Sequence, residues 1–408
     1  MKKYSKKNST IIVFAFLFFI SIHNNSYADN TNVDSKVSQT NATSTENFIL
    51  EPQYTGAVGS FSEGLAFISG YFIDKTGKVV SHIPINYYSY SRDGTYEFKD
   101  GVARIKDLSS YGVIDTSGNF VVPMKYKYIG EFNNGFAEIY NNGKFGFINK
   151  AGEEIVKPQY DGFGGFSEGY AVVEKNYKYG FINTTGKVVI SLKYSISRNF
   201  SGGLAAISVP SNIDFKYGFI DKTGKKVIAP QYDKVSDFNE GAAVALINGN
   251  QYIIDKTGKR IAKSERYYFY ESDVFNDGLF RVTNTDLNRD AFINKKGERI
   301  SKYYTHVSNY KNGFARVTGE PDFLTDNSKI GFINTSGKEI VSPKYTSAKD
   351  FSEGLAVVEL NGKYGFINTN GKEVIKPKYE DALSFSEGLA AVKINGKWGY
   401  IENPLKKR

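Results

Sequence analysis

The side chains best suited to chemistry in this sequence are glutamates that recur in a short Phe-x-Glu-Gly motif, at Glu63, Glu168, Glu240, Glu353 and Glu387. A pair of carboxylates can serve glycoside hydrolysis, with one acting as acid and the other as nucleophile or base. Such a pair needs two unlike environments in one place, whereas these glutamates recur in equivalent places. Asp or Asn replaces them in other copies of the motif. The pattern therefore predicts turn residues with a hydrogen-bonding role.

Two other combinations of residues give even weaker evidence of a catalytic or metal-binding site. Apart from the leader discussed below, the histidines are His82 and His306, and neither is close in sequence to a patterned serine or carboxylate, so nothing favours a Ser-His-Asp triad. Asp286-x-Asn288-x-Asp290 has the first three ligand positions of an EF-hand loop but lacks the glycine and the final glutamate of that loop.

The composition excludes several further kinds of site. Cysteine is absent, which excludes disulfides, cysteine nucleophiles and thiolate metal sites. We therefore predict no catalytic residue, no metal, no cofactor and no enzymatic activity. A hydrolase remains an alternative only if two carboxylates of unlike environment meet in a cleft, and no spacing in the sequence predicts this.

The element that must carry all these residues is a repeat, clearest from Gly354 to Glu387. Leu355 to Leu360 alternates between apolar and polar residues, Asn361-Gly362 is typical of a type I′ hairpin turn, and a second glycine turn follows the returning strand. Pro377 ends the third strand, because proline has no N–H for the ladder. Each unit is therefore predicted to be a three-stranded antiparallel meander, followed by a crossover to the next unit.

The repeats can be counted from their glycines. Those of the second turn are 34 to 41 residues apart, and a Phe-x-x-Gly corner, once with Tyr310 in place of Phe, occurs ten times. A period of this length is typical of repeat proteins in which each unit buries its apolar face against its neighbours. Insertions lengthen the first hairpin at 210–215 and 319–328, where exposed loops can drift neutrally or bind a partner.

The second hairpin strand carries a Tyr-Gly-Phe-Ile motif, as at Tyr364-Gly365-Phe366-Ile367, and becomes Lys397-Trp398-Gly399-Tyr400-Ile401 near the end of the chain. With the pattern of residues 224–244, these motifs make the chain resemble the WG-repeat proteins, also called KWG repeats. The resemblance covers essentially all of residues 50–402. It implies a tandem β-strand repeat, usually bacterial and often exported, with no general enzymatic activity and no agreed ligand.

The two ends of the array are complementary. The last unit lacks its third strand, and the chain begins with a segment of that kind, Phe48-Ile49-Leu50-Glu51-Pro52-Gln53-Tyr54. If this segment completes the last sheet, about ten units close a propeller-like ring without exposed edges. The alternative is an open β-superhelix. The predicted fold is all-β in both cases.

One strand position is variable enough to suggest a ligand face. The corner glycine is followed by Leu or by another residue in its place, and the variable position is the second residue after that one. It lies on the opposite side of the strand from a row of small apolar residues. The candidate ligand face comprises Phe67, Arg104, Arg281, Arg316 and Trp398. Its arginines would meet anionic groups or lie over a neighbouring unit, and exposed tyrosines nearby would stack on sugar rings.

The first 47 residues precede the array. Residues 1–28 contain Lys2, Lys3, Lys6 and Lys7, an apolar run from Ile11 to Ile22, and a small-x-small site ending at Ala28. They are predicted to be a secretory signal peptide, since the apolar run is shorter than the roughly twenty residues of a membrane span. Residues 29–47 are predicted to be a disordered linker and residues 48–404 the array.

These observations predict a secreted or cell-surface protein. Removing the four lysines of the leader lowers the formal net charge from +9 to +5, and no basic block remains to bind nucleic acid. No stable membrane span is expected after cleavage. We predict an exported binding or interaction scaffold whose ligand the sequence does not identify; its partner is an unknown protein or a cell-surface polymer, and the alternative function is binding of a cell-wall glycan or anionic polymer.

Overall fold

A computed structural model describes residues 48–83, 95–211, 214–263, 267–271, 273–321 and 328–406. The predicted signal peptide (1–28) and linker (29–47) lie outside these residues, as do the centres of the two inserted hairpin loops, 212–213 and 322–327. Glu46–Arg408 is one compact unit and is described by itself. Within it the described residues form ten antiparallel sheets and contain no helix. The all-β prediction is confirmed.

We number the repeats as units 1 to 10, one for each sheet along the chain. Ten strands form the first arm of a hairpin: β2 (Leu65–Ile68), β6 (Val102–Lys106), β10 (Phe136–Asn141), β14 (Tyr170–Lys175), β18 (Ala205–Pro210), β22 (Ala242–Ile247), β25 (Leu279–Asn284), β28 (Phe314–Pro321), β32 (Leu355–Leu360) and β36 (Leu389–Ile394). Ten strands form the second arm: β3 (Tyr71–Asp74), β7 (Tyr111–Asp115), β11 (Lys144–Asn149), β15 (Lys178–Asn183), β19 (Phe215–Ile220), β23 (Asn250–Asp255), β26 (Arg289–Asn294), β29 (Ser328–Asn334), β33 (Lys363–Asn368) and β37 (Lys397–Glu402).

Two further sets of strands flank these hairpins. The outer strands are β4 (Val79–His82), β8 (Phe120–Tyr126), β12 (Glu154–Tyr160), β16 (Val188–Tyr194), β20 (Lys226–Tyr232), β24 (Arg260–Lys263), β30 (Glu339–Tyr345), β34 (Glu373–Tyr379) and β1 (Phe48–Tyr54). The inner strands have two residues each: β5 (Phe98–Lys99), β9 (Tyr128–Ile129), β13 (Gly162–Phe163), β17 (Ile196–Ser197), β21 (Lys234–Val235), β27 (His306–Val307), β31 (Ser347–Ala348) and β35 (Asp381–Ala382).

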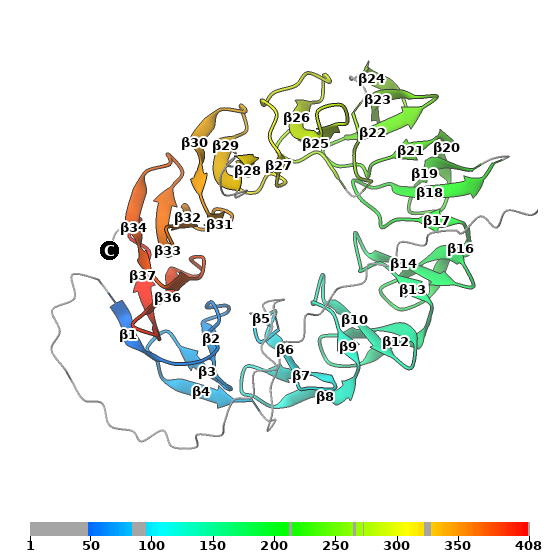
Figure 1. Ribbon diagram of the computed structural model, residues 1–408. Coiled ribbons are helices and arrows are strands. Elements are labelled where there is room, and N and C mark those ends of the chain that lie inside the picture. Colours follow the sequence, from blue (N-terminus) through cyan, green and yellow to red (C-terminus); the bar gives the residue numbers. More distant parts are fainter. Residues whose placement is uncertain are drawn as a thin grey trace, which may run out of the picture. The chain divides into compact units, whose positions relative to one another are not determined.

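The inner strands correct the predicted three-stranded unit. Eight of the ten sheets among the described residues have four strands, because the crossover itself pairs with the first hairpin strand. In unit 9, Ser347 and Ala348 pair with Glu359 and Val358. Two residues are too short to show the alternation by which the longer strands were recognised. In the compact unit the inner strands lie toward the centre of a circuit of sheets and the outer strands at its periphery (Figure 1).

The circuit is closed by the first strand of the chain. β1 pairs antiparallel with β37, with Phe48 opposite Ile401 and Tyr54 opposite Trp398, and so becomes the outer strand of unit 10. Two hydrogen bonds of 2.7 Å also join units 10 and 1: the Tyr400 hydroxyl donates to the Gly59 carbonyl, and between the corners the Ser386 hydroxyl donates to the Phe61 carbonyl. The predicted completion of the last sheet is confirmed, and the open superhelix is excluded.

The turns follow the predicted chemistry. Asn361 and Gly362 both have positive φ, at 53° and 72°, as a type I′ turn requires. At the corner, Glu353 and Gly354 have φ of 51° and 82°, and Ser352 and Leu355 exchange both backbone hydrogen bonds. The corner is therefore a second tight turn between the inner strand and the first hairpin strand.

The apolar core lies between units. The described residues form ten hydrophobic clusters, each drawn from two neighbouring units. A ring of the second hairpin strand meets the corner ring of the next unit, as in Phe366 and Phe385 with centroids 4.8 Å apart, and Tyr400 and Phe61 at 4.9 Å across the closure. Burying such rings supplies about 1.5 to 3 kcal/mol each. Each unit is thus stabilised by its neighbours, as the repeat period predicts.

The glycine of the Tyr-Gly-Phe-Ile motif allows the outer strand to approach closely. An added Cβ at Gly365 would lie 2.5 Å from the Ile375 carbonyl oxygen and 2.6 Å from the nitrogen of Pro377. Seven units have this glycine, and each has a seven-residue outer strand. Units 1, 6 and 7 have Tyr71, Tyr252 and Ala291 there. Their outer strands have four residues in units 1 and 6 and are absent from the described part of unit 7.

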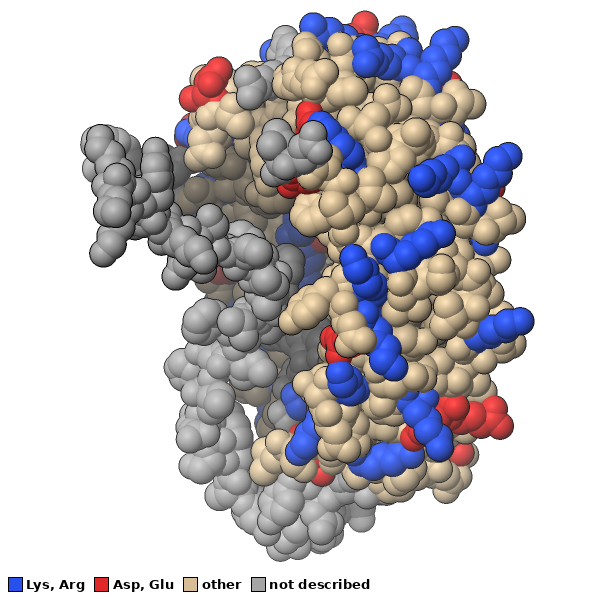
Figure 2. All heavy atoms as spheres, turned by 90° about the vertical axis from the view of Figure 1, so that its right-hand side faces the viewer, with Lys and Arg blue, Asp and Glu red and all other residues tan. Residues whose placement is uncertain are grey.

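Lysine and arginine gather on the outer strands. Figure 2 shows their side chains projecting over the face that carries units 4 to 6. The exposed basic residues of these outer strands and the turns before them are Lys187, Lys193, Lys225, Lys226, Lys259, Arg260 and Lys263. Charged side chains on an edge strand oppose pairing with another sheet. Edge protection is therefore one role that this distribution fits.

Candidate functional site

The corner glutamates join neighbouring units. Each accepts hydrogen bonds from a backbone N–H at the corner of the following unit: Glu63 from Gly101, Glu168 from Gly203, Glu240 from Gly278, Glu353 from Gly388 and Glu387 from Gly64. The last of these crosses the closure at 2.9 Å. These carboxylates therefore have the turn and hydrogen-bonding role that the sequence predicts.

We call these contacts between the corners of neighbouring units the corner seam. In several units, a lysine in the second turn of the following unit adds an ion pair to it. At the closure, the Lys75 ammonium lies 3.0 Å from the Glu387 carboxylate. Burial alone would raise the pKa of Glu387, but the hydrogen bonds from Lys75 and the N–H of Gly64 outweigh it and lower the pKa. The carboxylate is held ionised as a structural contact.

The predicted ligand face lies largely between units. Phe67 is 1% exposed and stacks on Tyr96 of unit 2 with centroids 4.5 Å apart. Trp398 is 7% exposed and packs in the cluster that joins units 10 and 1. The alternation placed Phe67 on the correct side of its strand, but that side faces the next unit. Sequence periodicity gives the side of a strand and not what covers it.

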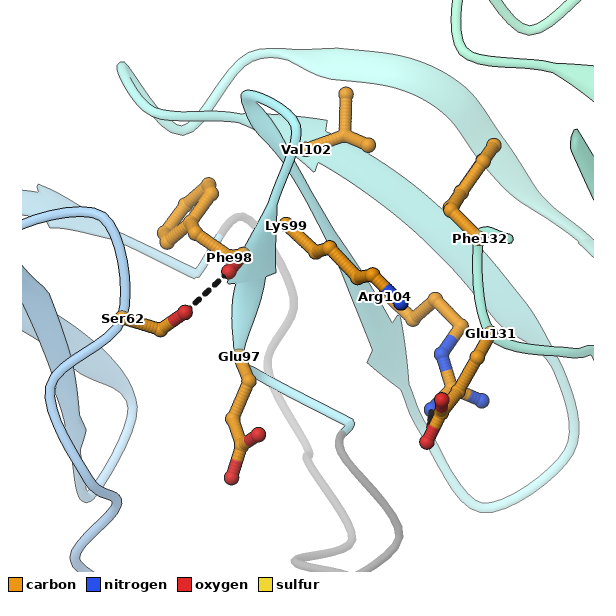
Figure 3. Close-up of a pocket in the computed structure, with 8 residues that line it drawn as sticks. All are labelled: Ser62, Glu97, Phe98, Lys99, Val102, Arg104, Glu131 and Phe132. Carbon is orange, nitrogen blue, oxygen red and sulfur yellow. Dashed lines mark hydrogen bonds and ion pairs between the residues drawn. The ribbon is translucent and has the colours of Figure 1, made fainter. Parts of the chain in front are cut away.

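Arg104 lines the pocket drawn in Figure 3. This cavity of about 220 Å³ is lined by residues of units 1 to 3, namely Ser62, Glu97, Phe98, Lys99, Val102, Arg104, Glu131 and Phe132. Arg104 is 4% exposed; its Nη1 donates to the Ile129 carbonyl at 3.0 Å, and its Nη2 lies 4.0 Å from Glu131. With two cations and two carboxylates in its lining, the pocket has no net charge to select an anion.

A third carboxylate lies near the same arginine. Burial raises the pKa of Glu138, Arg104 opposes that shift, and Glu131 adds to it. Glu138 occupies in unit 3 the strand position that Arg104 occupies in unit 2. Arg104 is therefore surrounded by acidic groups of the next unit.

Arg281 and Arg316 also bind acidic residues. Arg281 donates to both carboxylate oxygens of Asp273, at 2.8 and 3.4 Å, while Arg316 donates to Asp350 at 2.7 Å. Each guanidinium also reaches a carbonyl of the next unit's inner strand, at Val307 or Ala348. The three arginines of the predicted ligand face thus lie over neighbouring units, which is the second of the two interpretations that the sequence allowed.

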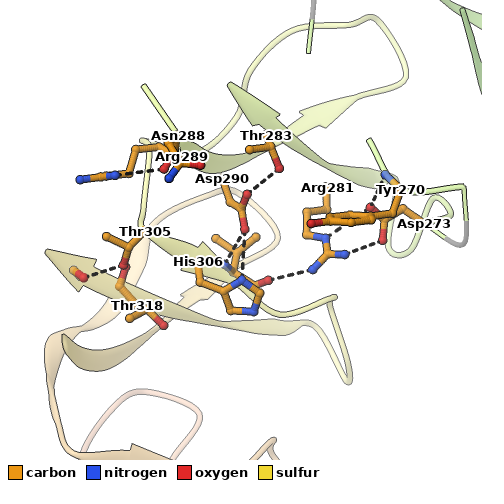
Figure 4. Close-up of polar contacts among 12 residues, drawn as sticks. Tyr270, Asp273, Arg281, Thr283, Asn288, Arg289, Asp290, Thr305, His306 and Thr318 are labelled. Carbon is orange, nitrogen blue, oxygen red and sulfur yellow. Dashed lines mark hydrogen bonds and ion pairs between the residues drawn. The ribbon is translucent and has the colours of Figure 1, made fainter. Parts of the chain in front are cut away.

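His306 lies beside a carboxylate that sequence distance concealed. Its Nδ1 is 3.2 Å from the carboxylate of Asp290, which lies 16 residues earlier in the chain. The hydroxyl of Thr283 donates to the other oxygen of Asp290, as Figure 4 shows. A triad needs its nucleophile on the second nitrogen of the histidine, whereas Thr283 contacts the acid. These three residues are not arranged as a nucleophilic triad.

The EF-hand spacing does not gather ligands. Asp290 is 8% exposed and binds Thr283 and the N–H of Val307. Asn288 lies in the hairpin turn with φ of 50°. Among the residues that the structure describes, no group of three or more His, Cys, Asp or Glu could hold a metal ion. No helix within those same residues has the length and hydropathy of a membrane span.

Sequence reasoning missed an aromatic and charged cluster where units 5, 6 and 7 meet. Tyr268 and Tyr270 are 45% and 50% exposed, in a segment that takes the place of an inner strand. Lys234 lies over Tyr268. Arg281 lies beside Tyr270, as Figure 4 shows. The signal available in the sequence was the run of aromatic residues from 267 to 270 inside a lengthened crossover.

Burial and charge act together in this cluster. Burial lowers the pKa of Lys234, while Glu271 and Asp273 oppose the shift. Burial likewise raises the pKa of Tyr217 to about 12, with Glu271 adding to the shift and Arg198 opposing it. The charged groups of units 5 to 7 therefore interact across two unit boundaries.

Comparison with known structures identifies the fold. The chain is similar to a crystal structure of the eukaryotic initiation factor at 11% identity and a TM-score of 0.51, with 87% of this chain and 100% of that chain covered. It also matches Citrobacter koseri AztD at 11% identity and a TM-score of 0.35, with 86% and 98% covered. Similar structures are β-propeller-like, and the chain has that architecture. No curated protein sequence matches the chain.

Comparison with protein families gives a match across the array. The WG-containing repeat matches residues 44–69, 111–145, 145–179, 179–209, 217–250, 330–364 and 364–398, which together span more than half of the chain. The unmatched stretches include most of units 1 and 7, where the motif glycine is missing. The chain belongs to the WG-containing repeat family.

Proposed function

We propose that this repeat protein is an exported, non-catalytic binding scaffold whose binding surface lies where units 5 to 7 meet. The observation that carries the proposal is the difference between two classes of polar residue. The corner carboxylates are used in joining units, whereas Tyr268 and Tyr270 are half exposed and belong to a segment that replaces the inner strand of the regular units. In a protein built from repeats, local departures are expected at functional sites.

The non-catalytic part rests on how the carboxylates are used. Both carboxylate oxygens of Glu353 accept from the one backbone N–H of Gly388, and the carboxylate pairs with Lys406. Equivalent contacts recur at Glu63, Glu168, Glu240 and Glu387. A general acid or base must be free to exchange a proton with a substrate. Carboxylates that hold backbone N–H groups in equivalent environments are better suited to joining units.

Photo-crosslinking in cells tests the scaffold and its location. A photoreactive phenylalanine would replace Tyr268 or Leu287 in the irregular units, and Leu108 or Tyr177 at regular hairpin turns; all four are exposed. We expect adducts at Tyr268, whether to protein or to polysaccharide, and none at Leu108 or Tyr177. Adducts at all four positions, or at none, would contradict the proposal. Fractionation of the same cells tests export, and retention in the cytoplasm would contradict it.

A second candidate, binding of an anionic polymer, is favoured by the exposed lysines of the outer strands (Figure 2). Contacts of this kind between exposed charges are screened by salt. Retention on immobilised teichoic acid should then fall steeply between low and high salt and should weaken on Lys225→Gln and Lys226→Gln substitution. If the retention of both variants on teichoic acid does not depend on salt, edge protection remains the role of these lysines.

A further inference from the structure

Two tyrosines of unit 7, which we call the tyrosine platform, form an exposed aromatic surface. The rings of Tyr268 and Tyr270 are edge to face, with centroids 5.2 Å apart and an interplanar angle of 89°. The backbone of Tyr268 exchanges two hydrogen bonds with Thr283, each 2.8 Å long, which fixes the segment against β25. The platform is therefore anchored to β25 by one backbone bridge.

Packing of the repeat does not require an aromatic residue at the position of Tyr268. In seven other units an inner strand pairs with the same part of the first hairpin strand. The residue there that corresponds to Tyr268 is Tyr128, Gly162, Ile196, Lys234, His306, Ser347 or Asp381. Phe269, between the two tyrosines, supplies the buried side chain and is 2% exposed. The two tyrosines are thus additions to a segment whose core contact is already made.

Cations hold the two rings in place. The ammonium of Lys234 lies 4.2 Å from the centroid of Tyr268 and donates to the carbonyl of Phe269. The guanidinium carbon of Arg281 lies 5.2 Å from the centroid of Tyr270. Cations over aromatic faces are attracted to the ring quadrupole. The rings are oriented before any ligand arrives.

Among the residues that the structure describes, the charges around the platform cancel. Arg198, Lys234 and Arg281 face Asp237, Glu271 and Asp273, which gives three cations and three carboxylates. Arg198 donates to Asp237 at 2.6 Å and to Glu271 at 2.8 Å, and Arg281 donates to Asp273 at 2.8 Å. A polyanion gains little from a site whose cations are already paired.

The geometry points to a neutral glycan as the ligand of this platform, in which sugar rings lie on Tyr268 and Tyr270 and their hydroxyls bind the paired charges at the edge. This inference rests on the proposed binding surface and names its ligand. Sugar rings have an apolar C–H face that an aromatic ring covers, and binding sites combine such surfaces with a few placed polar groups. Glu271, with 37% of its side chain exposed, is positioned as an acceptor for hydroxyls.

Calorimetric titration of the full chain with two uncharged probes, chitohexaose and cellohexaose, tests the inference. We expect binding of at least one probe, a loss of at least tenfold on Tyr270→Ala and a larger loss on the double variant with Tyr268→Ala. Tyr177→Ala is the matched control, because Tyr177 is 86% exposed at a regular hairpin turn, and should change affinity less than twofold. Affinity should vary less than twofold between 50 and 500 mM salt, since no net charge is paired.

Three results would overturn the inference: no binding of either probe, binding that the double variant retains, or binding that salt abolishes. Unchanged near-ultraviolet circular dichroism of each variant shows that the fold is retained, and Tyr270→Phe keeps the ring and should keep most of the affinity. A discrete protein adduct in the crosslinking experiment, with no probe bound, would reject the glycan while leaving the scaffold intact.

Discussion

The seven units with the motif glycine and the three without it differ in more than one residue. In unit 9, Gly365 lies against a seven-residue outer strand that contains Pro377. In unit 6, Gln251-Tyr252 replaces the Tyr-Gly pair, the outer strand shortens to four residues, and neither amide atom of Gln251 has a hydrogen-bond partner in the described structure. The close approach of the outer strand depends on the glycine, so the two features are lost together.

This comparison indicates that regular and irregular units have different roles in the array. Regular units use their aromatic rings and corner acids to hold neighbours, while the irregular units 6 and 7 expose the tyrosine platform. A unit that gives up its long outer strand loses backbone pairing, which the neighbouring units can compensate because each contributes a separate interface. The adjacent irregular units 6 and 7 lie between the regular units 5 and 8, which keep their long outer strands.

The largest effect is expected from making a regular unit irregular. Gly365→Ala places a Cβ 2.5 Å from the Ile375 carbonyl oxygen, and the outer strand must move. We expect a loss of about 3 kcal/mol in the free energy of unfolding, measured by chemical denaturation. The converse change, Ala291→Gly in unit 7, should cost about 1 kcal/mol at most. Equal costs at both sites would refute the link between glycine and outer strand.

The next effect concerns the closing strand, which comes from the other end of the chain. Leu50 is 6% exposed in the cluster of units 10 and 1. Leu50→Ala should cost about 2 to 3 kcal/mol, as at a buried position in any regular unit. Val79→Ala, on the short outer strand of unit 1 and 42% exposed, should cost under about 0.5 kcal/mol. A Leu50→Ala cost as small as that of Val79→Ala would show that closure contributes nothing.

A smaller effect, sensitive to pH, is expected at Glu387. Its pKa is lowered in the folded state, so the stability it contributes is present above its unfolded pKa of about 4.3 and is lost as the pH falls through the folded pKa. Glu387→Gln should cost about 1 kcal/mol at pH 7, and the difference from the unsubstituted protein should shrink below about pH 4. Glu51→Gln, at an exposed site, serves as control. A difference that persists at low pH would argue against the ion pair.

Much of the fold was readable from the sequence because the repeat shows each signal many times. Ten corners and nine turn glycines predicted the units, and the segment from Phe48 to Tyr54 predicted the closure. The inner strand was missed because two residues carry no periodicity. The ligand face failed at Phe67 because alternation does not reveal that the next unit covers it. The pair of His306 and Asp290 was missed because contact between β26 and β27, which belong to neighbouring sheets, brings together residues 16 positions apart.

The smallest predicted effect would repair a gap in the corner seam. Nine of the ten units have Glu, Asp or Asn at positive φ before the corner glycine, and unit 5 has Gly202. Gly202→Glu would offer a carboxylate to the N–H of Gly241 and to Lys256, whose equivalents Lys222 and Lys295 pair with corner glutamates at 3.2 Å. Both Gly202→Glu and Gly202→Ala bear the cost of a side chain at positive φ. The glutamate variant should therefore be more stable than the alanine variant by about 1 kcal/mol, and Lys256→Ala should remove part of that gain. Equal stability of the two variants would mean that the seam acts through the turn geometry and not through the carboxylate.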